Sequence, residues 1–313
     1  ALDGSTPQVL QIDSGLLAAQ ATTEIDYDAN LASTPLTTNY SSTVADSELL
    51  VPASYTVNPT VAGTGTVVGN DVSQFKGDSI SGGTITTYDA TGSKVTVNLR
   101  WAKTDSVASG GTDTWNLFYE TDSTATGVQV AWQNAGVDYK FDAAGKMSPA
   151  VSSVTLTNLT VNGVSVGDVT LKHSTGGITQ FADSNGTVKV NALTQNGYAA
   201  GSLQSVTVSD KGRVVGTYSN SRTIDLAEIT LANFKGSDGL KRLDGGAYAA
   251  TDESGDPTYD ASGKIVASSL EGSNADIADE FSKLIVTQQA YSANTRVITT
   301  TNQMVQDLLN MLR

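Results

Sequence analysis

Cysteine is absent from this 313-residue sequence, and histidine occurs only once, as His173. Without cysteine the chain can form neither a disulfide framework nor a thiolate metal site. A structural zinc site needs four Cys or His ligands, so one histidine excludes it as well. The fold must therefore be stabilised by packing and hydrogen bonding.

Basic residues are also scarce. Lys and Arg total 18 against 32 Asp and Glu, which gives a formal net charge of −14 and a pI near 4.3. Binding of nucleic acid draws on clustered Lys and Arg, so this composition argues against a nucleic-acid partner. The acidic residues are spread along the chain, which is typical of a protein that stays soluble at high local concentration.

Two kinds of targeting segment are missing. No run of about 18 apolar residues is present, so the sequence predicts no membrane insertion. The start, Ala1 to Pro7, lacks the basic and apolar regions of a secretory signal. It also lacks an initiator Met, and we expect a processed or partial product.

Strand-forming residues and turns dominate the first two thirds of the sequence. Ile85 and Tyr88, a turn at Asp89 to Gly92, and strict alternation from Val95 to Trp101 predict a hairpin with one buried face. Strand-like composition recurs in later segments, at residues 115–119, 128–132, 139–141, 154–161 and 164–171. Together these segments predict an antiparallel β domain.

The flanking segments carry weaker signals. Residues 1–22 are predicted to hold one or two strand pieces, and residues 23–74 short strands and loops, because Pro35, Pro52 and Pro59 forbid a long helix. Residues 191–201 are predicted to be a polar linker, followed by a smaller β unit. The predicted fold class is mainly β, with antiparallel sandwich-like or barrel-like domains in series and one long C-terminal α-helix.

The C-terminal segment has the period of a helix. Every seventh residue from Ile277 is apolar, and no Gly or Pro follows Gly272. With a capping box at Ser273 and Asp276, this pattern predicts a helix of about 36 residues with a coiled-coil stripe. We name this predicted self-assembly surface the first stripe, and its residues are Ile277, Phe281, Leu284, Tyr291, Ile298, Val305, Leu309 and Leu312.

The first stripe cannot be buried by the helix that carries it. A helix of this length at the end of a chain needs a partner, and we predict that neighbouring copies supply it, so that folding of the helix is coupled to polymerisation. Gln288, Thr295 and Asn302 interrupt the stripe with a polar middle. Such a middle would weaken a simple dimer and favour contacts that can shift.

One segment has the spacing of a catalytic motif. Gly163 to Gly167 reads Gly-x-Ser-x-Gly, the spacing around a serine nucleophile, with Ser165 at its centre. That motif must lie between a strand and a helix, and no helix is predicted here. The only histidine that could serve as its base is His173. We therefore interpret the segment as a hairpin turn, and we predict that the protein is not an enzyme.

Two further patterns could indicate ligands. Aromatic-Asp-Ala-x-Gly units begin at Tyr88, Phe141 and Tyr259, but each holds one carboxylate where a calcium loop needs several, so turns are predicted and no metal or cofactor is expected. Three tryptophans could form a sugar-stacking platform. They lie on the alternating apolar face of strands, so core packing is predicted for Trp101, Trp115 and Trp132.

Several segments resemble bacterial flagellar axial proteins of the rod and hook family. Leu270 to Asn274, Ala290 to Asn294 and Leu308 to Arg313 resemble the terminal helix of that family. Segments within residues 195–234 resemble the part that distinguishes hook proteins from their rod relatives, and the 87–104 hairpin with Trp115 resembles the hook outer domain. One departure is Gln289, where relatives usually carry a basic residue.

The resemblance implies a structural subunit of the flagellar hook, a tubular and flexible universal joint that transmits motor torque to the filament. It implies a location in the hook outside the cell, reached by type III export without a cleaved signal peptide. The implied partners are other copies of the chain in a helical homopolymer, rod and hook-filament junction proteins, the hook cap and the export apparatus.

The resemblance also implies four parts. Residues 1–22 would end the N-terminal half of an inner β domain, residues 23–191 would form an outer β domain, residues 192–269 the C-terminal half of the inner domain, and residues 270–313 the assembly helix. In that family the terminal helix packs with an N-terminal helix of the same chain. That N-terminal helix and the first part of the inner domain have no counterpart in this sequence.

Two alternatives stay open at this point. An extracellular β-rich glycan-binding module would use the tryptophans as its platform, but it would leave the long C-terminal heptad pattern unexplained. A distal rod protein of the same family would not need so large an outer β domain.

Overall fold

The computed structural model describes residues 10–12, 15–61, 64–259, 263–270 and 272–311. The chain forms two compact units, one of residues 1–208 with 212–262 and the other of residues 209–211 with 263–313. The first unit is built from strands, and the second contains one long helix. The predicted fold class, mainly β with a long C-terminal helix, is therefore confirmed.

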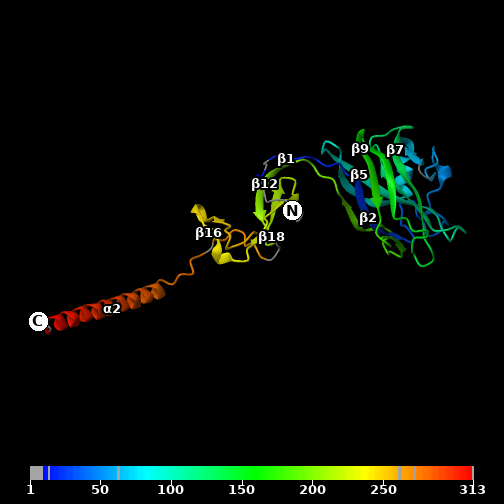
Figure 1. Cartoon of the computed structure of the whole chain (residues 1–313). Coiled ribbons are helices and arrows are strands. Elements are labelled where there is room, and N and C mark those ends of the chain that lie inside the picture. The colour runs from blue at the N-terminus through cyan, green and yellow to red at the C-terminus, as the bar shows by residue number, and fades with distance from the viewer. Residues whose placement is uncertain (1–9, 13–14, 62–63, 260–262, 271, 312–313) are drawn as a thin grey trace. The chain divides into compact units, whose positions relative to one another are not determined.

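Two sheets make up a β-sandwich in the first unit, and strands of both are labelled in Figure 1. The first sheet has the order β10-β2-β9-β8, and β11 also pairs with β2. Its strands are β2 (Glu24–Ala32), β8 (Ser153–Val161), β9 (Val164–Lys172), β10 (Ile178–Phe181) and β11 (Lys189–Gln195). The pairings of β2 with β9 and with β10 are parallel, whereas the sequence predicted antiparallel pairing throughout.

The second sheet is antiparallel and has the order β3-β7-β6-β5-β4. Its strands are β3 (Thr66–Val68), β4 (Ile80–Tyr88), β5 (Lys94–Asp105), β6 (Thr114–Glu120) and β7 (Val130–Lys140). The predicted hairpin at residues 85–101 is confirmed as β4 and β5. Its turn closes by a hydrogen bond from the Gly92 N–H to the Asp89 carbonyl, and Gly92 has φ +85°, a left-handed value that favours glycine.

Side chains from both sheets meet in one apolar core. Trp101 of β5 donates its indole N–H to the Tyr27 hydroxyl at 2.8 Å, and Tyr27 donates to the Gly82 carbonyl at 2.7 Å. The Trp101 ring also lies edge to face with Tyr139, with centroids 4.8 Å apart. The indole N–H of Trp101 and the hydroxyl of Tyr27 therefore both have hydrogen-bond partners, although both rings are buried at the centre of the core.

A second, smaller core covers the other face of the β3-β7-β6-β5-β4 sheet. Its cover comes from residues 33–77, which include η1 (Pro52–Ser54), η2 (Gly69–Asp71) and the short helix α1 (Val72–Gly77). Phe75 of α1 packs against Phe118 and Trp132, with ring centroids 4.9 and 5.4 Å apart. Every residue of β6 is buried, and its large side chains enter both cores: Trp115, Leu117 and Tyr119 lie in the first, and Phe118 lies in the second.

Two predictions from the sequence were wrong in this unit. Residues 23–74 contain a nine-residue strand, β2, and the beginning of the helix α1, where only short strands and loops were predicted. Residues 191–195, predicted as linker, continue β11, which pairs with β2. The side chains of β11 are exposed or only partly buried, so this strand carries little of the apolar alternation from which a strand is predicted.

A smaller antiparallel sheet has the order β1-β12-β13-β14. Its strands are β1 (Leu16–Leu17), β12 (Gly201–Val208), β13 (Arg213–Tyr218) and β14 (Thr223–Glu228), which confirms the predicted second β unit. Two short pairs follow: β15 (Ala232–Asn233) with β18 (Thr258–Tyr259), and β16 (Lys241–Arg242) with β17 (Tyr248–Ala249). The 3₁₀ turns η3 (Ser237–Gly239) and η4 (Asp244–Gly246) lie between these strands.

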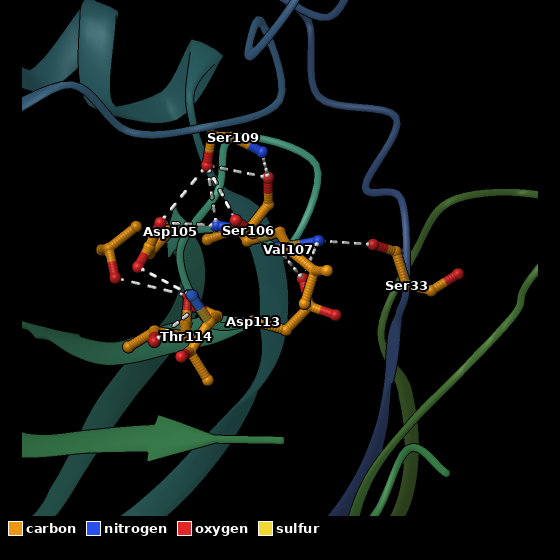
Figure 2. Close-up of polar contacts among 10 residues, drawn as sticks. Ser33, Asp105, Ser106, Val107, Ser109, Asp113 and Thr114 are labelled. Carbon is orange, nitrogen blue, oxygen red and sulfur yellow. Dashed lines mark hydrogen bonds and ion pairs between the residues drawn. The ribbon is translucent and has the colours of Figure 1, made fainter. Parts of the chain in front are cut away.

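An ion pair between a buried lysine and a partly exposed aspartate fixes the loop between β5 and β6 (Figure 2). Lys103, only 4% exposed, places its Nζ 3.0 Å from Asp113 and donates to the Ser33 carbonyl at 2.8 Å. In the same loop, the Asp105 carboxylate accepts hydrogen bonds from the N–H groups of Ser106 and Thr112. The bond from Lys103 to Ser33 connects the loop to the end of β2, and the Asp113 carboxylate balances the charge of the buried Lys103 ammonium.

Removing the acid of this pair should destabilise the protein more than removing the base. Asp113→Ala leaves a buried ammonium without its counter-ion, and we expect it to lower the free energy of unfolding by about 3 kcal/mol. Lys103→Met removes the buried charge at similar volume and should cost less, and adding it to Asp113→Ala should recover part of the loss. Urea denaturation of the three variants measures this, and equal stability of the two single variants would contradict it.

Candidate assembly surface

The helix α2 (Ile277–Met311) is 35 residues long and is drawn as one uninterrupted helix in Figure 1. It begins at an aspartate cap: Asp276 Oδ1 accepts the Ala278 N–H at 2.8 Å, and the Asp276 carbonyl accepts the Glu280 N–H at 3.0 Å. Asp279 and Glu280 in the first turn complement the positive end of the helix dipole. The sequence predicted a capping box with Ser273 as the cap. In the structure the Ser273 hydroxyl accepts the Ala275 N–H, outside the helix, and Asp276 is the residue that caps α2.

The first stripe lies along this helix and is open to solvent. Exposure of its described residues runs from 49% for Leu284 to 76% for Tyr291, and no described residue of α2 is buried. Leu312 lies outside the described residues. Each step of seven residues falls about 20° short of two full turns, so the stripe winds slowly around the helix, as in left-handed coiled coils.

The polar middle of the stripe is less polar than the sequence suggests. Thr295 donates its hydroxyl to the Tyr291 carbonyl one turn earlier, at 2.9 Å, which leaves its methyl group for outside contacts. Thr287, Thr299, Thr300 and Thr301 make the same kind of bond to carbonyls of the preceding turn. The polar interruption therefore reduces to two amides, those of Gln288 and Asn302.

Other exposed apolar side chains of α2 were not part of the predicted surface. Val286, Val297, Met304, Leu308 and Met311 are between 58% and 86% exposed. A single seven-residue column was read from the sequence, and these residues fall outside it. A second reading at steps of three or four residues from Val286 would have found them.

The serine-nucleophile alternative is not supported by the geometry. Gly163 lies in the β8–β9 hairpin turn with φ +81°, and Ser165 follows on β9, so the interpretation as a hairpin is confirmed. His173 is buried, with Nδ1 2.6 Å from the Tyr27 carbonyl and Nε2 3.0 Å from the Tyr139 hydroxyl. A carbonyl can only accept, so Nδ1 donates and Nε2 accepts from Tyr139.

Burial lowers the pKa of His173, although its hydrogen bond to Tyr27 and the nearby Asp28 carboxylate act in the opposite direction. Because the folded-state pKa lies below the unfolded value of about 6.5, the unfolded chain binds more protons between the two. The stabilising contribution of neutral His173 is therefore complete above pH 6.5 and is lost as the pH falls below it.

The lowered pKa predicts that the free energy of unfolding depends on pH in this range, and that His173 alone causes this dependence. The free energy of unfolding of the wild-type chain should fall as the pH drops below about 6.5. His173 is the only histidine, so His173→Gln should lack that slope, whatever its own stability. Urea titrations at several pH values measure both proteins, and an equal slope in the two would contradict the assignment.

The aspartate turns and the tryptophans have structural roles. The carboxylates of Asp89 and Asp142 accept N–H groups of their own turns, whereas the third such unit, at Asp260, lies outside the described residues. No cluster of three potential metal ligands occurs among the described residues. Trp101, Trp115 and Trp132 are at most 3% exposed, so the prediction of core packing is confirmed and no sugar platform forms from them.

Two family models match the chain and cover much of the structure just described. "Flagellar basal body protein FlaE D2 domain" matches residues 78–198, which hold most of the sandwich. "Flagellar basal body rod FlgEFG protein C-terminal" matches residues 266–311, which hold α2. The sandwich and the helix together define the class as the axial proteins of the bacterial flagellum.

Comparison with individual relatives shows which flagellar axial proteins the chain is similar to. The flagellar hook protein FlgE of Caulobacter vibrioides is 37% identical over 46% of this chain, and that of Brucella abortus is 32% identical over 72%. The Salmonella typhimurium hook protein is 27% identical over 98% of the chain. The chain belongs to the flagellar hook protein family. It spans 25%, 53% and 68%, respectively, of the lengths of these three relatives.

A solved structure shows the same fold. The crystal structure of the Helicobacter pylori flagellar hook protein FlgE2 superposes with a TM-score of 0.53, over 82% of this chain and 78% of that one. The sequence identity of 14% is low, so this likeness concerns the fold alone. Among the described residues, no helix has the length and apolar character needed to cross a membrane.

Proposed function

We propose that the chain is a structural subunit of the bacterial flagellar hook, which assembles with copies of itself into a tube that bends while it transmits torque from motor to filament. The observation that carries this function is the exposed first stripe on a 35-residue helix. Membership of the hook protein family supports it. The proposed assembly residues are Ile277, Phe281, Leu284, Tyr291, Ile298, Val305, Leu309 and Leu312.

Order in α2 is proposed to depend on assembly. The helix is rich in Thr, Val, Ile and Asn, which are weaker helix formers than Ala or Leu. Helices without tertiary contacts are marginal in water, and most helical stability in proteins comes from packing of an apolar face. Neighbouring copies would bury the first stripe, so assembly would stabilise the helix itself.

The remaining parts of the proposal follow from this role. Residues 23–191 would be the outer domain of the subunit, and residues 192–195 would go with it because β11 pairs with β2. Residues 1–22 and the rest of 192–269 would belong to an inner domain, and residues 270–313 would form the tube-building helix. The subunit would work outside the cell after type III export, without catalysis or a cofactor. Beyond its own copies, it would contact rod and junction proteins, the hook cap and the export apparatus.

The two alternatives lose support. A glycan-binding module would need its tryptophans at the surface, and they are buried. A distal rod protein would share the C-terminal helix, but the large sandwich matched by the D2 model favours the hook.

Self-assembly is tested by sedimentation and negative-stain electron microscopy of the purified chain over a wide concentration range. We expect tubular or filamentous polymers above a critical concentration, and monomers below it. A particle that stays single at every concentration would reject the proposed function.

A further inference from the structure

The chain passes between the sandwich and the small β1-β12-β13-β14 sheet twice. The first passage, residues 18–23, leads into β2, and the second, residues 196–200, follows β11. The two strands are direct neighbours, because β11 pairs with β2 from Ile25 to Asn30. A force that the backbone carries between the sandwich and the small sheet therefore enters the sandwich along β2 and β11.

The strand β2 has a neighbour on each of its edges. It pairs with β9 at Glu24–Asp26 and with β10 at Ala29–Ala32, in both cases in parallel. Ala29 pairs with Val190 of β11 and also with Ile178 of β10, so β11 and β10 lie on opposite edges of the strand. Moving β2 along its own axis would therefore break hydrogen bonds on both edges.

A force along β2 would load these hydrogen bonds in shear. Inter-strand hydrogen bonds run across the strands, so a pull along the strand axis acts on many of them at the same time. A pull that separates two strands from one end breaks the bonds one pair after another. The outermost strand β8 and its neighbour β9 can be opened in this second way, because β8 lies at the edge of the sheet.

Side chains of β2 add bonds to the segment that runs from β9 to β10. Asp28 accepts the Ser174 N–H at 2.9 Å and the hydroxyl of the same residue at 2.6 Å. Asn30 accepts the Phe181 N–H at 2.8 Å and the Thr179 hydroxyl at 2.9 Å. Asp and Asn are disfavoured in strands, so these bonds, and not strand propensity, explain the two residues in β2.

The end of β2 that is distant from the two passages is also fixed. The Ser33 carbonyl accepts from the Lys103 ammonium at 2.8 Å (Figure 2), and the Ser33 N–H donates to the Phe181 carbonyl at 3.3 Å. The Leu36 N–H donates to the Gly186 carbonyl at 3.0 Å. A Cβ at Gly186 would clash with the Leu36 backbone, so glycine permits this close approach. These contacts hold the chain beyond β2 in place.

The two passages are bonded to each other where they meet the sandwich. Gln20 and Tyr198 exchange two backbone hydrogen bonds of 2.9 Å. Closer to the strands, the Asn196 side chain accepts the N–H groups of Thr23 and Glu24 at 3.0 and 3.1 Å. A pull on one passage is therefore shared with the other, so β2 and β11 would be loaded together.

We propose that β2 and β11 are the mechanical anchor of the sandwich: force from the rest of the subunit enters along these two strands, is resisted in shear by their pairings, and is held at the distant end by the contact of Lys103 with Ser33. This inference rests on the proposed function, because a subunit that transmits torque has to resist such a force. The buried lysine would thus have a mechanical role in addition to its ion pair.

Pulling single molecules of the full chain in optical tweezers tests the anchor. The natural chain has no cysteine, so two introduced cysteines define where the handles attach. Ala18→Cys with Ala108→Cys applies force between the first passage and the β5–β6 loop, along β2. Ser152→Cys with Thr175→Cys separates the start of β8 from the end of β9. All four positions are exposed. We expect unfolding at one fixed force to be at least about tenfold slower in the first geometry than in the second.

A substitution at the distant end tests the contact with Ser33. Lys103→Met keeps the volume of the buried side chain, and in the first geometry it should speed unfolding at a fixed force at least about tenfold. In the second geometry the same variant should unfold within about twofold of its parent, because β8 and β9 do not load that contact. Lys172→Met is the matched control: it removes a half-exposed ion pair with Glu24, which contributes little, and should change neither rate.

The outcomes separate the anchor from the proposed function. Equal unfolding rates in the two geometries would overturn the anchor, and so would an equal effect of Lys103→Met in both. The comparison of geometries uses the natural residues at positions 33 and 103, so it stands even when Lys103→Met fails to fold. Single molecules are pulled, so the result does not depend on polymerisation. Polymers of a chain without the anchor would leave the hook function standing, whereas an anchored chain that never polymerises would reject that function.

Discussion

Ile298→Asp is expected to abolish polymers while leaving the β domains folded. Ile298 lies midway along the first stripe, is 63% exposed in the single chain and contributes no core contact there. In a polymer it would be buried, and burying an unpaired carboxylate would cost roughly 3 kcal/mol or more per subunit contact. That cost corresponds to a loss of at least about a hundredfold in the affinity of a subunit for the growing end.

Asn310→Asp serves as the matched control, because it introduces the same side chain on the same helix at a polar position outside the first stripe. We expect this variant to polymerise at close to the wild-type critical concentration. Near-UV circular dichroism of both variants reports on the sandwich core, which holds two fully buried tryptophans, and should match wild type. Polymers of normal yield from Ile298→Asp would reject the role given to the first stripe.

Trp101→Ala should produce the largest loss of stability in the sandwich. The Trp101 ring is fully buried, packs edge to face with Tyr139 and donates its N–H to Tyr27. Replacing a buried Trp by Ala costs about 3–5 kcal/mol, which is a large part of the total stability of a typical domain. Thermal unfolding followed by tryptophan fluorescence should show a melting temperature lower by about 10 °C.

Two controls isolate the contribution of packing in that experiment. Trp101→Phe keeps most of the apolar contact and loses the hydrogen bond, so its melting temperature should lie between those of wild type and the Ala variant. Tyr248→Ala removes an aromatic ring that is 60% exposed, and should leave the melting temperature within about 2 °C of wild type. An unchanged melting temperature for Trp101→Ala would contradict the position of this ring at the centre of the core.

Some elements could be predicted because local signals and tertiary packing agree. The β4–β5 hairpin has alternation on both strands and a turn with Asp at its start and Gly in the left-handed position, and the structure has all three. The hairpin of β8 and β9 is a similar case. A local pattern of this kind needs no knowledge of distant residues, so one sequence is sufficient to find it.

Other elements depend on partners that are distant in the chain. The strand β11 lacks apolar alternation, and it exists because it pairs with β2, some 165 residues earlier in sequence. The strand β6 is buried on both faces only because residues 33–77 cover its second face. No window of neighbouring residues carries either fact, which is why β11 was predicted as linker and α1 was not predicted.

The helix α2 also has some features that could be predicted from the sequence and others that could not. Its existence and its first stripe could be predicted, since a seven-residue period over 35 residues is a strong local signal. The hydrogen bond from Thr295 to the Tyr291 carbonyl could not be, because threonine can also direct its hydroxyl outward. That bond turns a position read as polar into one that presents a methyl group.

Hydrogen–deuterium exchange of monomer and polymer, compared residue by residue, tests the central claim that α2 is completed by neighbouring copies. In the monomer the amides of residues 277–311 should exchange rapidly, because no packing protects an exposed helix, while the sandwich core exchanges slowly. On polymerisation, protection should increase strongly over α2 and little in the sandwich. Slow exchange of α2 in dilute monomer, or no gain in the polymer, would contradict the account.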